Sequence, residues 1–164
     1  MEKNIEELRI RLVTPDDREK LYRFFRRLGE EGSTFFNRGG GNENGAYAFL
    51  DGKLPNHIYW AAVADTPEGE EIAGIVFLWR KDTKVPWLGI GIAEPWKGRH
   101  LGRRLMTTAR EWAQAAGAGG ICLTTAPTNF RGQGLYERMG YERIGTYHDG
   151  EFLYQLTLPN ENVK

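Results

Sequence analysis

One stretch of the sequence combines glycines with basic side chains at the expected start of a helix. From Leu88 to Leu105, an alternating strand leads through a proline-containing turn into a glycine-rich segment. Four basic residues lie there: Lys97, Arg99, Arg103 and Arg104. The first turn of a helix leaves about four backbone N–H groups without partners and carries partial positive charge. Because Gly98 and Gly102 allow close backbone approach, the stretch predicts an anion site suited to a pyrophosphate.

Other functions use related patterns. The dinucleotide-binding fold places Gly-x-Gly-x-x-Gly after a parallel strand with an acidic residue roughly 20 positions later, and this stretch has neither feature. The Gly-Lys-Ser/Thr ending of a nucleoside-triphosphate loop is missing as well. A nucleic-acid module could use this basic cluster with Trp96, but 22 basic and 22 acidic residues give the chain no net charge. From the residues alone, a helix with a solvated basic face stays open.

The stretch resembles the cofactor-binding motif of the GCN5-related N-acetyltransferases (GNAT), written Arg/Gln-x-x-Gly-x-Gly/Ala. The motif falls here on Lys97, His100 and Gly102. Lys97 keeps the positive charge, whereas His100 replaces a glycine, so the loop must form with a side chain present. The resemblance implies acetyl-CoA as cosubstrate. It assigns cofactor binding to Ile90, Ile92, Lys97, Gly98, Arg99, His100, Leu101, Gly102, Arg103 and Asn129.

A second segment, from Asn129 to Tyr141, resembles the family pattern Asn-x-x-Ala-x-x-Leu-Tyr-Glu-Lys-x-Gly-Phe, with Gly132 in place of Ala. By itself Tyr136 is most simply a core aromatic. The resemblance implies that its hydroxyl donates a proton to the departing thiolate. For Asn129, a helix cap and a contact with the cofactor both stay open.

The resemblance also implies a splayed strand before the basic turn. Free backbone amides of Ile90 and Ile92 would bind the pantetheine chain and polarise the acetyl carbonyl, although both side chains alone indicate only a core strand. Such donors can contribute roughly 3 kcal/mol each. We expect direct attack by a primary amine in a ternary complex, and a non-catalytic acyl-CoA sensor is the alternative. The general base stays open between a water relay and three carboxylates: Glu94, Asp149 and Glu151.

The elements that position these residues follow from the apolar pattern. Alternation predicts strands, and recurrence every three to four residues predicts helices. The predicted strands are 8–12, 58–64, 72–79, 85–93, 121–125, 141–147 and 152–158, and the predicted helices are 14–29, 98–116 and 128–139. We expect an α/β fold with a single mixed, mostly antiparallel sheet flanked by helices, in one domain over residues 1–164. The GNAT resemblance implies this same acyl-CoA N-acyltransferase fold.

Residues 32–55 break the helical pattern with glycine-rich and asparagine-rich runs. We expect a mobile connector here, with a short helix over 46–50. Substrate selectivity tends to reside in mobile loops over a rigid scaffold. The connector is therefore expected to face the acceptor, a small-molecule amine or a peptide amine.

The composition limits the remaining possibilities. Cys122 is the only cysteine and suits a small buried position, and the three histidines show no metal-ligand spacing, so we expect no metal. We expect no signal peptide, because the N-terminus lacks a basic start and an apolar run, and no stretch has the roughly 18 consecutive apolar residues of a membrane helix. We expect a cytoplasmic protein that binds neither membrane nor nucleic acid, and a homodimer stays open.

Overall fold

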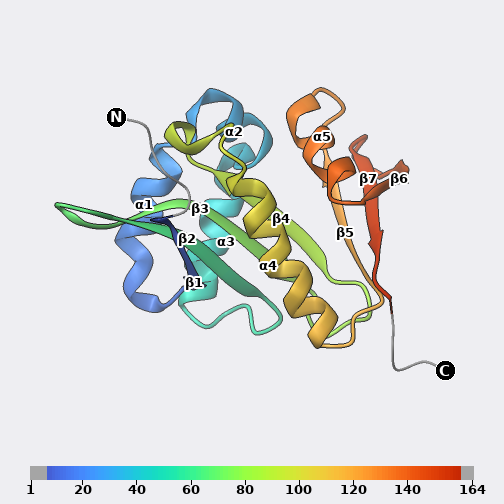
Figure 1. Ribbon diagram of the computed structural model, residues 1–164, viewed down its shortest axis with the longest axis horizontal. Coiled ribbons are helices and arrows are strands. Elements are labelled where there is room, and N and C mark those ends of the chain that lie inside the picture. Colours follow the sequence, from blue (N-terminus) through green and yellow to red (C-terminus); the bar gives the residue numbers. More distant parts are fainter. Residues whose placement is uncertain (1–6, 160–164) are drawn as a thin grey trace.

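One continuous sheet organises the chain (Figure 1). The structure, a computed structural model, describes residues 7–159. Its strands are β1 (Arg9–Leu12), β2 (Ile58–Thr66), β3 (Gly69–Trp79), β4 (Trp87–Ile92), β5 (Gly120–Thr125), β6 (Glu142–Thr146) and β7 (Phe152–Thr157). They lie in the order β1-β2-β3-β4-β5-β7-β6, and neighbours are antiparallel except for β4 and β5. The predicted mixed, mostly antiparallel sheet is confirmed.

Helices cover both faces of this sheet. They are α1 (Arg18–Arg26), α2 (Gly29–Phe35), α3 (Gly41–Leu50), α4 (Leu101–Ala115) and α5 (Phe130–Arg138). A Cβ on Gly74 of β3 would lie 2.9 Å from Leu105 of α4, whereas Phe77 packs edge-on against Phe36, which follows α2. Because strand side chains alternate between faces, Gly74 and Phe77 point in opposite directions. The α4 helix therefore covers one face, and the N-terminal helices cover the other.

The first helical segment begins with a buried acidic side chain. Asp17 accepts a hydrogen bond from the Thr14 N–H at 2.8 Å and a bidentate pair from Arg11, with both distances 2.8 Å. Burial alone raises the pKa of Asp17, but the bonds from Arg11 and Thr14 outweigh it and hold that pKa below its usual value. The predicted start at Thr14-Pro15 is confirmed, although the first turn, Pro15–Asp17, is a 3-10 helix and α1 ends at Arg26 instead of residue 29.

The connector expected over residues 32–55 is more helical than predicted, because only a short helix over 46–50 was expected and it forms the second half of α3. This segment contains the end of α2, a 3-10 turn at Arg38–Gly40 and the whole of α3. Gly39 and Gly40 have positive φ and separate the helices. Tertiary packing stabilises α3, because the ring centroids of Phe49 and of Tyr59 in β2 lie 4.6 Å apart and Tyr47 contacts Phe25. Packing of this kind overrides the low helix propensity of the glycines.

Candidate functional site

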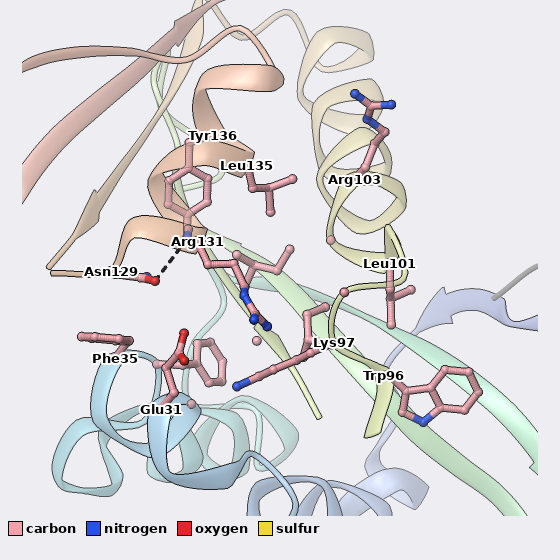
Figure 2. Close-up of a pocket in the computed structure, with 18 of the residues that line it drawn as sticks. Glu31, Phe35, Trp96, Lys97, Leu101, Arg103, Asn129, Arg131, Leu135 and Tyr136 are labelled. Carbon is pink, nitrogen blue, oxygen red and sulfur yellow. Dashed lines mark hydrogen bonds between the residues drawn. The ribbon is translucent and has the colours of Figure 1, made fainter. Parts of the chain in front are cut away.

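A cavity of about 360 Å³ lies between α2, β4, the first turn of α4 and the length of α5. Its size falls within the range of small-molecule sites. It is bordered by Leu28, Glu31, Gly32, Phe35, Phe36, Ile90, Gly91, Ile92, Trp96, Lys97, Gly98, His100, Leu101, Gly102, Arg103, Asn129, Arg131, Gly132, Leu135, Tyr136 and Arg138. Every predicted cofactor-binding residue except Arg99 borders it, as does Tyr136. Figure 2 shows α2 below the cavity, opposite α5, with α4 at the side.

The inner wall of the cavity forms where two parallel strands separate. The β4 strand pairs with β3 along its whole length, but its pairing with β5 is limited to Trp87 opposite Cys122. The Ala93 N–H donates to Ala73 in the β3 direction, and the Cys122 N–H donates to Pro86 in the β5 direction. Because backbone groups alternate along an antiparallel strand, even-numbered residues of β4 direct theirs toward β5. The N–H groups of Ile90 and Ile92 therefore face the gap.

The start of α4 has the backbone conformation that the resemblance required. His100 is the N-cap residue and has φ 65°, and Gly98 has φ 74°. Only glycine adopts this left-handed region without steric cost. A Cβ on Gly98 would meet no atom within 4 Å, so the backbone there borders open space. His100 adopts this left-handed conformation although it has a side chain.

The predicted basic side chains have different surroundings. Lys97 borders the cavity, and its Nζ lies 3.0 Å from Glu94 Oε2. Arg104 does not border the cavity, and its guanidinium donates to the Leu8 carbonyl at 3.2 Å. Its expected place beside the anion is therefore wrong, because the α4 turn directs it toward the N-terminal segment. Arg99 is also absent from the cavity wall.

Two arginines of α5, Arg131 and Arg138, border the cavity but were missed in the sequence. Figure 2 shows the guanidinium of Arg131 extending toward the side chain of Lys97. Their spacing from Leu135, four residues before it and three after it, was the available signal, because such residues share one helix face. Which face would meet α4 depends on tertiary packing.

Asn129 caps α5. Its Oδ1 accepts from the Gly132 N–H at 3.1 Å, and its Nδ2 donates to Thr125 Oγ1 at 3.1 Å. A Cβ on Gly132 would lie 2.5 Å from that Nδ2, so the departure from the alanine of the family pattern makes room for this side-chain position. The cap that the sequence left open is confirmed. The same side chain borders the cavity.

Tyr136 is both a core residue and a wall of the cavity. It is 8% exposed, and its ring lies 6.0 Å from Tyr154 and 6.4 Å from Tyr141. Burial raises the pKa of Tyr136 to about 12, with smaller contributions from the charges of Glu151 and Tyr154. The hydroxyl is therefore protonated at neutral pH and has a proton to donate.

The α2 side of the cavity was not predicted. Glu31, Phe35 and Phe36 border it, and the two phenylalanines lie in the segment 32–55 that was expected to be a connector. A Cβ on Gly91 would lie 2.6 Å from the Phe36 ring, so the glycine lets this ring lie directly over β4. The adjacent phenylalanines in a polar stretch were the only sequence signal.

Two further features concern the part of the chain that the structure describes. No helix between residues 7 and 159 is long and apolar enough to span a membrane. Within the same residues, no group of three or more His, Cys, Asp or Glu side chains is placed to hold a metal ion. Cys122 is buried, as expected.

Several solved structures share this fold. A domain from Methanocaldococcus jannaschii has a TM-score of 0.75 at 21% identity, covering 92% of this chain and 98% of that one. PaiA N-acetyltransferase from Thermoplasma acidophilum, solved in complex with coenzyme A, has a TM-score of 0.74 at 15% identity, covering 92% and 99%. A GNAT-family acetyltransferase from Streptococcus pneumoniae has a TM-score of 0.71 at 26% identity, covering 93% and 100%.

Sequence comparison gives the family directly. A search of curated proteins finds no match. A family model described as the acetyltransferase (GNAT) family matches residues 30–141. The match includes the glycine-rich start of α4 and the segment from Asn129 to Tyr141. Since it spans more than half of the chain, the protein belongs to the acetyltransferase (GNAT) family.

Proposed function

We propose that this protein is an N-acetyltransferase that moves an acetyl group from acetyl-CoA to a primary amine in a ternary complex. The divergence of β4 from β5 carries the proposal. It directs the N–H groups of Ile90 and Ile92 into the cavity that the α4 start and Tyr136 also border. Backbone donors, a positive helix end and a protonated phenol in one cavity suit acyl transfer from a thioester.

The chemistry of the cavity matches the parts of acetyl-CoA. Apolar side chains of β4, α2 and α5 border the interior, while Lys97 and Arg131 provide positive charge. The α4 start has open space above Gly98, where a Cβ would meet no atom within 4 Å. We therefore assign the pyrophosphate to the α4 start and the pantetheine arm to the β4 edge. PaiA N-acetyltransferase, which has this fold, was solved with coenzyme A.

In the proposed reaction, the neutral amine attacks the thioester carbonyl. The N–H groups of Ile90 and Ile92 stabilise the developing oxyanion, and Tyr136 donates a proton to the sulfur as the C–S bond breaks. The amine must lose a proton before or during its attack. Among the three carboxylates considered as base, Glu94 is paired with Lys97, whereas the charge of Glu151 acts on Tyr136. None of the three borders the cavity, so the proposal assigns none of them as the base.

The test is to incubate the protein with acetyl-CoA and a panel of amines that includes small molecules and peptide N-termini, while following thiol release. We expect amine-dependent release in the wild type. Gly102→Glu should abolish it, because the new side chain would crowd the α4 start and repel the pyrophosphate. Tight binding of acetyl-CoA without turnover on any amine would instead support an acyl-CoA sensor. Unchanged affinity in Gly102→Glu would contradict the cofactor site.

A further inference from the structure

Three exposed arginines border the cavity without acidic partners. Arg103 lies on α4, and Arg131 and Arg138 lie on α5. None of them forms an ion pair with a residue in the range 7–159. All six arginines between residues 9 and 27, by contrast, are in ion pairs. The positive charge beside the cavity is therefore available to an anionic ligand.

Two of these arginines lie on either side of the contact between α4 and α5. A Cβ on Gly102 would be 2.8 Å from Leu135 Cδ2, so the two helices approach closely at this point. Arg103 follows Gly102 on α4, and Arg138 lies one turn after Leu135 on α5. A Cβ on Gly134 would be 3.2 Å from an Arg138 guanidinium nitrogen, so this side chain lies back along its helix.

The third arginine has a different orientation. Figure 2 shows Arg131 extending toward Lys97, whereas Arg103 projects from α4 away from that pair. Lys97 and Arg131, with the N–H groups at the α4 start, account for the pyrophosphate of the proposed cosubstrate. Coenzyme A carries one more anionic group, the phosphate monoester on the 3′ oxygen of its ribose. Arg103 and Arg138 are left to meet it.

We infer that Arg103 and Arg138 together bind the 3′-phosphate of coenzyme A, so that the protein distinguishes coenzyme A from its 3′-dephosphorylated form. The inference rests on the proposed function, because it assumes that coenzyme A enters this cavity. A guanidinium is always charged and presents paired N–H groups that match phosphate oxygens. One arginine from each helix can grip a phosphate that lies across their contact.

The experiment compares coenzyme A with 3′-dephospho-coenzyme A by titration calorimetry at low salt. Two exposed ion pairs predict that the wild type binds coenzyme A roughly two- to thirtyfold more tightly. Arg103→Gln and Arg138→Gln should each reduce this ratio, and the double variant should bring it close to one. Affinity for the dephosphorylated form should stay the same in all of them. Raising the ionic strength should also shrink the wild-type preference.

Arg110→Gln is the matched control. Arg110 lies two turns beyond Arg103 on α4, carries the same charge and does not border the cavity. It should leave both affinities and their ratio unchanged. Equal wild-type affinity for the two nucleotides, or an equal loss of both in the Arg103 and Arg138 variants, would overturn the inference alone. If neither nucleotide bound to the wild type, the proposed function would fail as well.

Discussion

At His100, the backbone turns into α4 with a φ of 65° that glycine would adopt more readily. His100→Gly should therefore keep or raise the affinity for coenzyme A and should not lower the melting temperature. Gly98→Ala is the opposite change at a similar φ of 74° and should cost about 1 kcal/mol of stability. Calorimetry with coenzyme A and thermal unfolding measure both effects. A clear loss of affinity in His100→Gly at neutral pH would mean that the imidazole contacts the ligand.

Tyr136→Phe tests the proton donor without removing the ring that packs against Tyr154 and Tyr141. We expect normal acetyl-CoA binding and turnover at least about tenfold slower, because general acids typically contribute about 100- to 10,000-fold. If turnover is unchanged, product release can hide the effect, so the first turnover is measured by rapid mixing. A full-speed first turnover in the variant would exclude the Tyr136 hydroxyl as the donor.

Among the elements, the α4–α5 contact depends on the absence of a side chain at Gly102. Gly102→Ala would place its Cβ 2.8 Å from Leu135, so we expect a stability loss of roughly 1–3 kcal/mol and weaker coenzyme A binding. Leu135→Ala also destabilises the protein, because it removes part of the helix contact. The double variant should lose less stability than the sum of the losses in the two single variants, as measured by urea unfolding. Additive losses would show that the cost of Gly102→Ala does not come from its contact with Leu135.

The elements also differ in how far the sequence could predict them. The alternating strands were placed within about three residues, and the α4 start was recognised from Gly98, Gly102 and Lys97, because local chemistry specifies these features. Only residues 46–50 of α3 were expected to be helical, because the stability of the whole helix depends on contacts with other elements, such as that of Phe49 with Tyr59. The same reason hid Arg131, Arg138 and the α2 side of the cavity.

For the whole molecule, buried tyrosines make stability sensitive to alkaline pH. Burial raises the pKa of Tyr59, Tyr136 and Tyr141 above the usual value near 10, and that of Tyr136 is about 12. A pKa that is higher in the folded than in the unfolded chain contributes stability that is fully present at pH values below the unfolded-state pKa. This contribution is lost as the pH rises through the folded-state pKa. Urea unfolding between pH 8 and 12 should therefore show a steep decline above about pH 10.

The Tyr136→Phe variant provides the control for this decline. Removing one titrating hydroxyl should make the fall in the free energy of unfolding between pH 8 and 12 smaller by roughly 2–3 kcal/mol, because each pKa unit corresponds to about 1.4 kcal/mol. The same decline in the variant and the wild type would mean that Tyr136 titrates alike in the folded and unfolded chains.

The single pairing of Trp87 with Cys122 also has a mechanical consequence. Hydrogen bonds between neighbouring strands join β1, β2, β3 and β4 into one part of the sheet and β5, β7 and β6 into the other. The two parts meet at this pair. Under stretching force, rupture should begin along this seam, since few backbone bonds cross it. Variants selected only for rigidity would gain hydrogen bonds between β4 and β5. The β4 amides in those bonds would no longer face the cavity. In this protein, more hydrogen bonds between β4 and β5 would raise the resistance to force but reduce the access of a ligand to the β4 amides.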